Sequence, residues 1–351
     1  MTPTNVLLTC SGTRVDMVQA FQAALAREGR GGKVIVADAS DLAPTRFFAE
    51  VAASVPTVSD PAYVDCVIEL AREHAARVVM PLTDLDQALL TARRADFAAI
   101  GAQVIASDPE TCEICLDKYL AHRLFEQHGI GTPWTRLADE LPDPAEVPFP
   151  VLVKAREGFA ARNIWRAADA VELAFFLGYT PAASMVQQVC DGVEISTDLI
   201  CDLEGRCIEA VPRSMIESKG GETIKGTSLD DADVRAFAVR VAETLGIKGP
   251  ACVQVFVCAD GMRVTDVNPR FGGGFPLHVA AGGGFPDTVL ALGRGERPEP
   301  RVGSYEPGVT MLRYLSQVIV TRDQSGALQV GDDRTGVATE QTRFATEQTR
   351  S

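Results

Sequence analysis

The sequence predicts an α/β amino-terminal domain with a parallel sheet, followed by an α+β region with a small lobe and a mixed or antiparallel sheet. Three observations support this fold class. Up to about residue 109, short apolar strands alternate with amphipathic helices, the pattern of βαβ units. A block of strand, helix and strand follows over about 118–187. From Glu194 onward, strands follow one another directly, which favours antiparallel pairing.

Length and composition indicate a globular protein of two or three domains. The chain has 351 residues, of which 46% are hydrophobic and 23% charged. A net charge of −14 argues against nucleic acid or an anionic membrane as the main partner. No signal peptide or membrane-spanning run is expected, so the predicted location is cytoplasmic.

The cysteines are expected to be reduced and buried. Cys112 and Cys115 form a C-x-x-C pair, but no second pair or histidine pair accompanies them. A zinc site is therefore the weaker interpretation and packing the stronger one.

The first 109 residues are taken as one domain. Its predicted strands are 6–8, 34–36, 78–80 and 104–106, and its predicted helices are 15–27, 61–75 and 85–100. Three polar turns follow strands, at 10–14, 38–40 and 83–84, where ligands of parallel sheets bind. None of them matches the G-x-G-x-x-G fingerprint, so each is predicted to be a plain loop with ligand contact as the alternative.

The second region, 110–187, is predicted to be a small lobe. Asp108 and Pro109 have the residue types that begin a helix. An apolar strand at 151–154 ends in Lys154, a helix covers 168–177, and a further strand covers 184–189.

The third region, 188–325, is predicted to be a β-meander interrupted by a helix. Its strands are 194–201, 206–212, 254–257 and 262–268, and the helix over 230–245 is capped by Asp230 or Asp231. Gly-Gly-Gly-Phe-Pro occurs at 272–276 and 282–286 and is predicted to form turns, with backbone approach to a ligand as the alternative. We expect His278 to be structural. The polar tail 326–351, with its repeated Ala-Thr-Glu-Gln-Thr-Arg, is excluded from the fold.

A candidate metal site lies on the hairpin turned at Asp260-Gly261. Residues two apart in a strand share a face, so Asp266 and Asn268 point the same way and Gln254 can join them from the neighbouring strand. One carboxylate and two amide oxygens suit Mg²⁺. Arg270 follows at once, with a side chain suited to phosphate or carboxylate. The alternative is a polar strand end leading into a glycine turn.

Two lysines precede this hairpin in the chain. Lys154 ends a strand and is followed by a loop of small residues at 156–163, an arrangement suited to polyphosphate. A strand, a short connection and a second strand that carries Glu194 describe a hinge, whose backbone could pair with a purine edge. Taken one at a time, such residues are more often surface features than ligands.

The order of these motifs resembles the ATP-grasp superfamily, closest to the branch of the carbamoyl phosphate synthetase large subunit. The resemblance covers Val6 to about Val320. It is carried by the two lysines, the hinge with its glutamate, and Gln254 followed by Asp266-Val-Asn-Pro-Arg270. The run from Asn268 to Gly274 is its most specific piece.

The resemblance implies an ATP-grasp fold and a nucleotide between the second and third regions. Lys118 and Lys154 would contact phosphates, Gln187, Gln188 and Val189 would meet adenine, and Glu194 would hold the ribose. Gln254, Asp266 and Asn268 would hold Mg²⁺, as two ions in most members, with Mn²⁺ also suitable. Arg270, and less directly Arg213, would sit at the transferred phosphate or the substrate carboxylate.

The implied activity is ATP-dependent ligation of a small-molecule carboxylate to an amine through an acyl phosphate. Two departures from the family pattern stand out: Ala160, Ala161 and Asn163 replace typical glycine or serine, and Asp266 replaces the usual glutamate. The altered loop leaves a non-catalytic nucleotide-binding subunit open as one alternative. A second alternative is a bicarbonate-dependent enzyme that forms carboxy- or carbamoyl phosphate. A homodimer is expected on general grounds.

Overall fold

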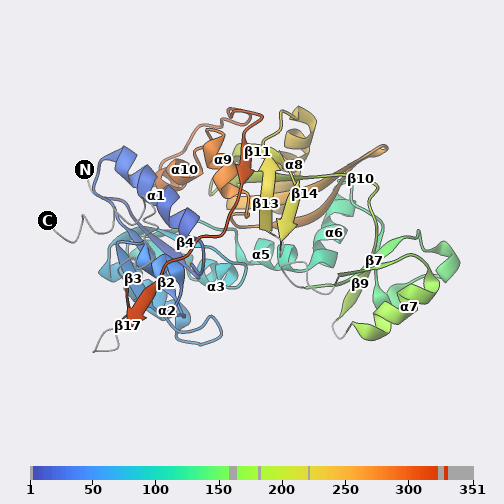
Figure 1. Cartoon of the computed structure of the whole chain (residues 1–351), viewed down its shortest axis with the longest axis horizontal. Helices are drawn as coiled ribbons and strands as arrows, with labels where there is room; N and C mark the ends of the chain where they lie inside the picture. Colours follow the sequence, from blue (N-terminus) through green and yellow to red (C-terminus); the bar gives the residue numbers. More distant parts are fainter. Residues whose placement is uncertain (1–2, 158–163, 181–182, 220–221, 323–327, 331–351) are drawn as a thin grey trace.

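The computed structural model describes residues 3–157, 164–180, 183–219, 222–322 and 328–330. Three lobes follow one another along the long axis of the molecule (Figure 1). In that view the amino-terminal domain and the lobe that carries α7 lie at opposite ends. The antiparallel sheet that contains β10, β11 and β14 lies between them.

The amino-terminal domain is a five-stranded parallel sheet with the order β3-β2-β1-β4-β5. Its strands are β1 Asn5–Thr9, β2 Val34–Asp38, β3 Val51–Ser54, β4 Ala76–Pro81 and β5 Gln103–Val104. Its helices are α1 Val15–Glu28, η1 Pro44–Phe47, α2 Tyr63–Glu73, α3 Gln87–Ala92 and α4 Arg94–Ala99. The parallel sheet is therefore confirmed, while β3 was not predicted and the single helix expected at 85–100 is two short helices.

The strand order reverses direction between β1 and β4, which makes the carboxyl ends of these two strands the switch point of the sheet. Asp86 is fully buried at this switch point and accepts hydrogen bonds from Thr9 and Tyr63, at 2.6 and 2.8 Å. Cys10, beside it, has a φ of 48°, in the left-handed region that non-glycine residues rarely adopt.

The small lobe is the four-stranded antiparallel sheet β6-β9-β7-β8 with helix α7 Ala170–Tyr179. Its strands are β6 Thr135–Leu137, β7 Val151–Ala155, β8 Ile164–Ala167 and β9 Ser184–Gln188. Two short 3-10 helices, η2 Ala138–Glu140 and η3 Pro144–Glu146, lie between β6 and β7. The lobe has its own core, which includes Val151, Val153 and Leu173.

The two helices before this lobe, α5 Pro109–Leu116 and α6 Lys118–Gln127, pack elsewhere. Cys115, Ala121 and Phe125 belong to the core of the third lobe. The small lobe therefore begins after α6 rather than at residue 110. Sequence pattern could not place this boundary, because an amphipathic helix does not reveal which sheet its apolar face covers.

The third lobe is built on the antiparallel sheet β11-β10-β14-β15. Its strands are β10 Gly192–Cys201, β11 Cys207–Ser214, β14 Gly249–Cys258 and β15 Gly261–Asn268, and one face is covered by α8 Ala232–Leu245. Asp231 caps α8 by accepting from the amide of Val234 at 2.9 Å. Gly261 has the positive φ that the predicted turn requires.

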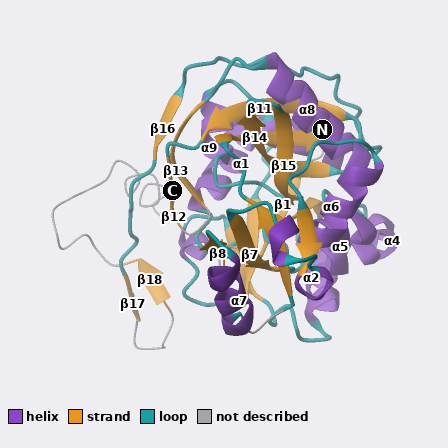
Figure 2. Ribbon diagram, turned by 90° about the vertical axis from the view of Figure 1, so that its right-hand side faces the viewer, coloured by secondary structure: helices purple, strands orange, loops and turns teal. Residues whose placement is uncertain are grey.

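The remaining elements of the third lobe are α9 Phe275–Ala280, α10 Phe285–Gly293 and a small sheet of β12 Glu217–Lys219, β13 Glu222–Thr227 and β16 Thr310–Leu312. A separate hairpin, β17 Val320–Arg322 with β18 Leu328–Val330, stands beside the body (Figure 2). The expectation that nothing beyond 326 folds is wrong for 328–330, where three residues pair with β17. The rest of the tail lies outside the described residues.

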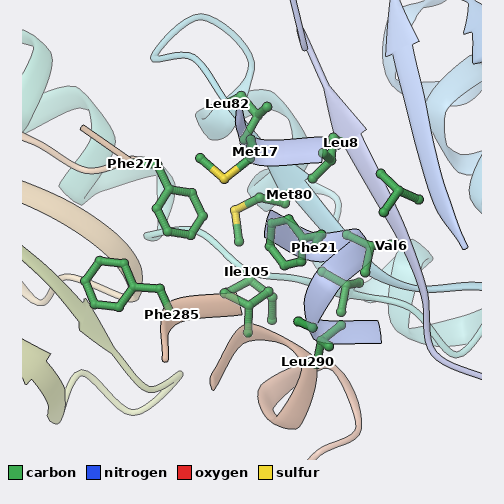
Figure 3. Packing of buried hydrophobic residues seen from close by; sticks show 14 of the residues in the cluster. Val6, Leu8, Met17, Phe21, Met80, Leu82, Ile105, Phe271, Phe285 and Leu290 are labelled. Carbon is green, nitrogen blue, oxygen red and sulfur yellow. The ribbon is translucent and has the colours of Figure 1, made fainter. Parts of the chain in front are cut away.

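One apolar core joins the first domain to the third lobe (Figure 3). Phe271 makes an edge contact with Phe21 of α1, with ring centroids 6.4 Å apart. Phe285 and Leu290 of α10 belong to the same cluster as Val6 and Met80 of the parallel sheet. This shared core holds the carboxyl edge of the first sheet next to the end of β15.

The two glycine repeats wrap buried ion pairs of the protein itself. A Cβ at Gly274 would lie 1.9 Å from Arg213 Nε, and one at Gly283 would lie 1.9 Å from His278 Nε2. His278 is 1% exposed and its Nε2 lies 3.2 Å from Glu209 Oε2. His278 is thus structural, as expected, and the glycines allow the backbone to approach buried polar side chains.

Candidate active site

The antiparallel sheet of the third lobe packs one face on α8 and carries polar side chains on the other. Its apolar residues, such as Leu199, Val253 and Val267, pack with the residues of α8 in one core. The register sets Ser196 opposite Gln254, and Gln254 opposite Asp266. Because side chains alternate along a strand, Ser196, Gln254 and Asp266 lie on the side away from α8, where Ile200 and Ile208 join the core shared with the first domain.

Three residues meet at the end of β15 on this face. Lys118, the first residue of α6, places Nζ 3.6 Å from Asp266 Oδ1. Asn268 Nδ2 donates to Asp266 Oδ2 at 3.0 Å, so the two side chains point the same way, as the spacing predicts. Lysine, carboxylate and amide from two distant segments therefore form one cluster.

Arg270 joins this cluster to the first domain. Its Nη2 donates to Asn268 Oδ1 and its Nε donates to Asp84 Oδ2, both at 3.0 Å. Burial lowers the pKa of Arg270, but the charges of Asp84 and Asp266 outweigh burial and raise it overall. The guanidinium therefore stays charged at the junction of two lobes.

Lys154 ends β7 in the small lobe and is 7% exposed. Its Nζ donates to Gln187 Oε1 at 2.8 Å, and Gln187 Nε2 donates to Thr135 Oγ1 at 3.0 Å. Burial lowers the pKa of Lys154 to about 8, because a desolvated ammonium is unfavourable, and Asp266 opposes that shift. Among the described residues its one hydrogen-bond partner is neutral, so this buried lysine has capacity for an anionic ligand.

The hinge residues Gln187 and Gln188 end β9, and Val189 follows before β10 begins at Gly192. The amide of Gln188 donates to Trp134 O at 2.9 Å and that of Val189 to Pro150 O at 3.0 Å. Neither amide is therefore available to a base in this arrangement, and the contact of the hinge with adenine stays a prediction. Burial raises the pKa of Glu194, Arg213 opposes the shift and Asp266 adds to it.

Arg213 lies in β11 opposite Ser196 but is only 2% exposed. Its Nε donates to Asp198 Oδ2 at 2.6 Å and its Nη1 to Thr223 Oγ1 at 2.5 Å. These contacts tie β11 to β10 and β13. Its expected contact with substrate stays a prediction.

The base of the loop after Lys154 is attached to the start of α6. Arg156 Nε donates to Asp117 Oδ2 at 2.6 Å, and the same carboxylate caps α6 through the amides of Tyr119 and Leu120. The amide of Lys118 donates to Arg156 O at 3.0 Å. Residues 158–163 of the predicted phosphate loop, with Ala160, Ala161 and Asn163, lie outside the described residues.

The donor set fits a magnesium nucleotide in its chemistry. Asp266 is the sole carboxylate among the three predicted ligands, and the described residues contain no group of three His, Cys, Asp or Glu that could hold a metal. A site with so few charges of its own suits an ion that also takes phosphate oxygens. Lys118 supplies the positive charge beside Asp266 in this structure.

Two small cavities flank Asp266, and both are lined by Lys118. One, of about 10 Å³, reaches Gln187 on the small lobe, and the other, of about 20 Å³, reaches Asp84 on the first domain. A larger hollow of about 740 Å³ lies over α8, lined by Arg235 and others, and shares none of these residues. We place the site by the chemistry of its side chains rather than by size.

Family models match two parts of the chain. Residues 6–105 match the model described as "PylC-like, N-terminal domain" and residues 180–316 match "ATP-grasp in the biosynthetic pathway with Ter operon". The second match contains the hinge, Glu194 and all three predicted metal ligands. The carboxy-terminal part of the chain carries an ATP-grasp domain. The resemblance inferred from the sequence is thereby confirmed, and so is the fold class.

Curated ATP-grasp relatives align over parts of this chain. A D-alanine–D-alanine ligase of Gloeobacter violaceus is 34% identical over 113 residues, 28% of this chain and 36% of the relative. A carbamoyl phosphate synthase large chain of Kineococcus radiotolerans is 24% identical over 188 residues, 48% of this chain and 17% of the relative. The chain thus spans only a minor part of each relative.

Among solved ATP-grasp structures, an L-amino acid ligase from Bacillus licheniformis aligns with a TM-score of 0.65. The alignment covers 85% of this chain and 76% of the ligase at 19% sequence identity. At that identity the likeness supports the fold alone. Within the described part of this ATP-grasp chain, no helix has the length and hydropathy to cross a membrane.

Sequence reasoning named the turn at Asp84 but not its role, gave no role to Asp117, and missed Asp198. Asp84 pairs with a residue 186 positions away. Asp117 carried a local signal, because it immediately precedes a helix that it caps. Asp198 gave none, since a carboxylate inside a strand does not identify its partner.

Proposed function

We propose that the chain is an ATP-dependent ligase that joins the carboxylate of one small molecule to the amine of another. The observation that most supports this proposal is the cluster of Lys118, Asp266 and Asn268, fixed to Asp84 of the first domain through Arg270. It combines cations, a carboxylate and amide oxygens at a point where segments of two lobes meet. These are the groups that transfer of a phosphoryl group between two anions requires.

In the proposed assignment, Lys118 and Lys154 contact the phosphates of ATP. Gln254, Asp266 and Asn268 hold Mg²⁺, as one or two ions, with Mn²⁺ as a substitute. The hinge residues Gln187, Gln188 and Val189 face adenine and Glu194 faces the ribose. Arg270 and Arg213 offset the charge of the transferred phosphate or of the substrate carboxylate.

The proposed chemistry has two steps. A carboxylate oxygen attacks the γ-phosphorus, the bond to the bridging oxygen breaks, and ADP leaves with an acyl phosphate remaining. The nitrogen of an amine then attacks the acyl carbon and loses a proton, and inorganic phosphate leaves. Positioning and fixed charge do most of this work, because both reactants of the first step are anions.

ADP release tests this proposal. Purified protein with Mg-ATP is supplied with pairs of amino acids, and we expect ADP and phosphate to form only with a suitable acid and amine. Firm Mg-ATP binding without turnover for any pair would instead support a nucleotide-binding subunit. Turnover that depends on bicarbonate and on no other acid would support a carboxy-phosphate enzyme.

A further inference from the structure

Asp84 lies in the turn that follows β4, at the carboxyl edge of the parallel sheet. One of its oxygens, Oδ2, accepts from Arg270 Nε at 3.0 Å. The other, Oδ1, is buried and receives no hydrogen bond from any residue that the structure describes. Buried carboxylate oxygens are normally hydrogen-bonded, so this one calls for a donor.

Asp84 lines a cavity of about 20 Å³ together with Lys118, Asp266 and Asn268. That volume is sufficient for one group of the size of a water molecule. The same cavity is therefore lined by the aspartate whose Oδ1 lacks a donor and by the two strand residues proposed to hold the metal. A group bound there would lie next to the proposed site of phosphoryl transfer.

The charges around the cavity restrict its occupant. Asp84 and Asp266 are negative, whereas Lys118 lines the cavity and Arg270 contacts Asp84. A carboxylate or phosphate offers no donor to Asp84 and is repelled by its charge. A second divalent cation would face two fixed positive charges. A small donor with at most one positive charge fits best, which describes a water molecule or the amino group that would replace it.

We propose that Asp84 binds the amino group of the nucleophilic substrate through Oδ1, while Arg270 holds its other oxygen. This inference rests on the proposed ligase function and specifies one residue that selects its second substrate. The carboxylate would receive an N–H of the amine beside Asp266 and Asn268. It also gives a reason why the polar turn after β4 carries an aspartate.

The test compares wild type with Asp84→Asn and a matched control. An asparagine retains an oxygen for Arg270 Nε and places an NH2 group where the second oxygen stood. The proposed acceptor of the amine is thereby replaced by a donor, while the Arg270 contact remains. Asp65→Asn is the control, because Asp65 is 69% exposed on α2 of the same domain and pairs with Arg93. Thermal unfolding confirms that all three proteins are folded.

The kinetic measurement uses the most active amine of the amino-acid panel, and hydroxylamine as a minimal amine. We expect Asp84→Asn to raise the KM for both amines at least tenfold and to leave the KM for Mg-ATP within twofold of wild type. Asp65→Asn should match wild type in both. An unchanged KM of Asp84→Asn for the amines would overturn the inference. So would a wild-type activity with the hydroxy acid lactate, in place of the amine, that equals the activity with the amine.

A binding measurement decides the inference even if no pair of substrates turns over. Labelled methylammonium is titrated into protein with Mg-ADP and followed by NMR. We expect binding to wild type and to Asp65→Asn but not to Asp84→Asn. Equal binding to all three proteins, no binding to any, or loss of Mg²⁺ binding alone in Asp84→Asn would overturn it. If wild type binds the amine as predicted but no pair of substrates turns over, the result counts against the ligase function and not against the amine site.

Discussion

Lys118 Nζ lies 3.6 Å from Asp266 Oδ1, although the two residues come from a helix that follows the first domain and from the last strand of the antiparallel sheet. Lys118 reaches this position because Asp117 caps the helix and fixes its first turn. Asp266 reaches it through pairing of β15 with β14. The pair thus ties the packing of α6 on the third lobe to the proposed metal site.

Lys154→Met is expected to weaken binding of Mg-ATP by ~1–3 kcal/mol, the size of a charge-assisted hydrogen bond to a buried group. The methionine retains the volume of the side chain and removes the charge. Calorimetric titration with Mg-ATP measures the effect. Lys33→Met, at an exposed position before β2, is the control and should bind as wild type does. Equal affinity of Lys154→Met would remove this lysine from the nucleotide site.

We predict that Glu209 makes the stability of the folded protein fall as the pH is lowered. Burial raises the pKa of Glu209, but hydrogen bonds from His278 and Thr288, the charge of His278 and the Gly284 amide lower it to about 2. A depressed carboxyl pKa stabilises the fold above the unfolded pKa of 4.5 and loses that contribution as pH falls toward 2. The difference between the pKa values of Glu209 in the unfolded and folded states corresponds to about 3 kcal/mol in the free energy of unfolding, at ~1.4 kcal/mol per pKa unit.

Urea unfolding at pH 7, 4 and 3 measures this contribution. Wild type should lose stability over that range more steeply than Glu209→Gln, which has no carboxyl to protonate. Glu299→Gln, at an exposed position, is the control and should follow wild type. Parallel curves for wild type and Glu209→Gln would show that Glu209 titrates equally in both states.

Gly274→Ala is expected to destabilise the fold by ~1–3 kcal/mol, because the added carbon meets the buried Arg213 guanidinium. Gly178→Ala is the matched control. No atom of the described residues lies within 4 Å of a Cβ at Gly178, which sits inside α7, so alanine should stabilise that helix by up to ~1 kcal/mol. Thermal unfolding compares the two, and equal melting temperatures would contradict this explanation of the first glycine repeat.

The sequence was sufficient for what local pattern determines. Alternating strands and helices predicted the parallel sheet, and Asp260-Gly261 predicted the hairpin that carries Asp266. The period of two along β15 predicted that Asp266 and Asn268 share a face, which their hydrogen bond bears out. These inferences depend only on residues close together in the chain.

Contacts between distant segments could not be predicted in the same way. The pair of Arg270 with Asp84 depends on the core that docks α10 on the first sheet, and no local pattern encodes it. The sheet of β12, β13 and β16 was also missed, because its strands are short and one comes from much later in the chain. The same holds for α6, whose packing partner is the third lobe.

The measurement that tests the account most directly is ADP release by the double variant Asp266→Ala with Asn268→Ala, followed over a range of Mg²⁺ concentrations. Asp260→Asn, in the exposed turn of the same hairpin, is the control. We predict that turnover falls at least 100-fold in the double variant, an effect of about 3 kcal/mol, while its melting temperature stays near that of wild type and the control is unaffected. Wild-type turnover and Mg²⁺ dependence in the folded double variant would contradict the metal assignment and the ligase function with it.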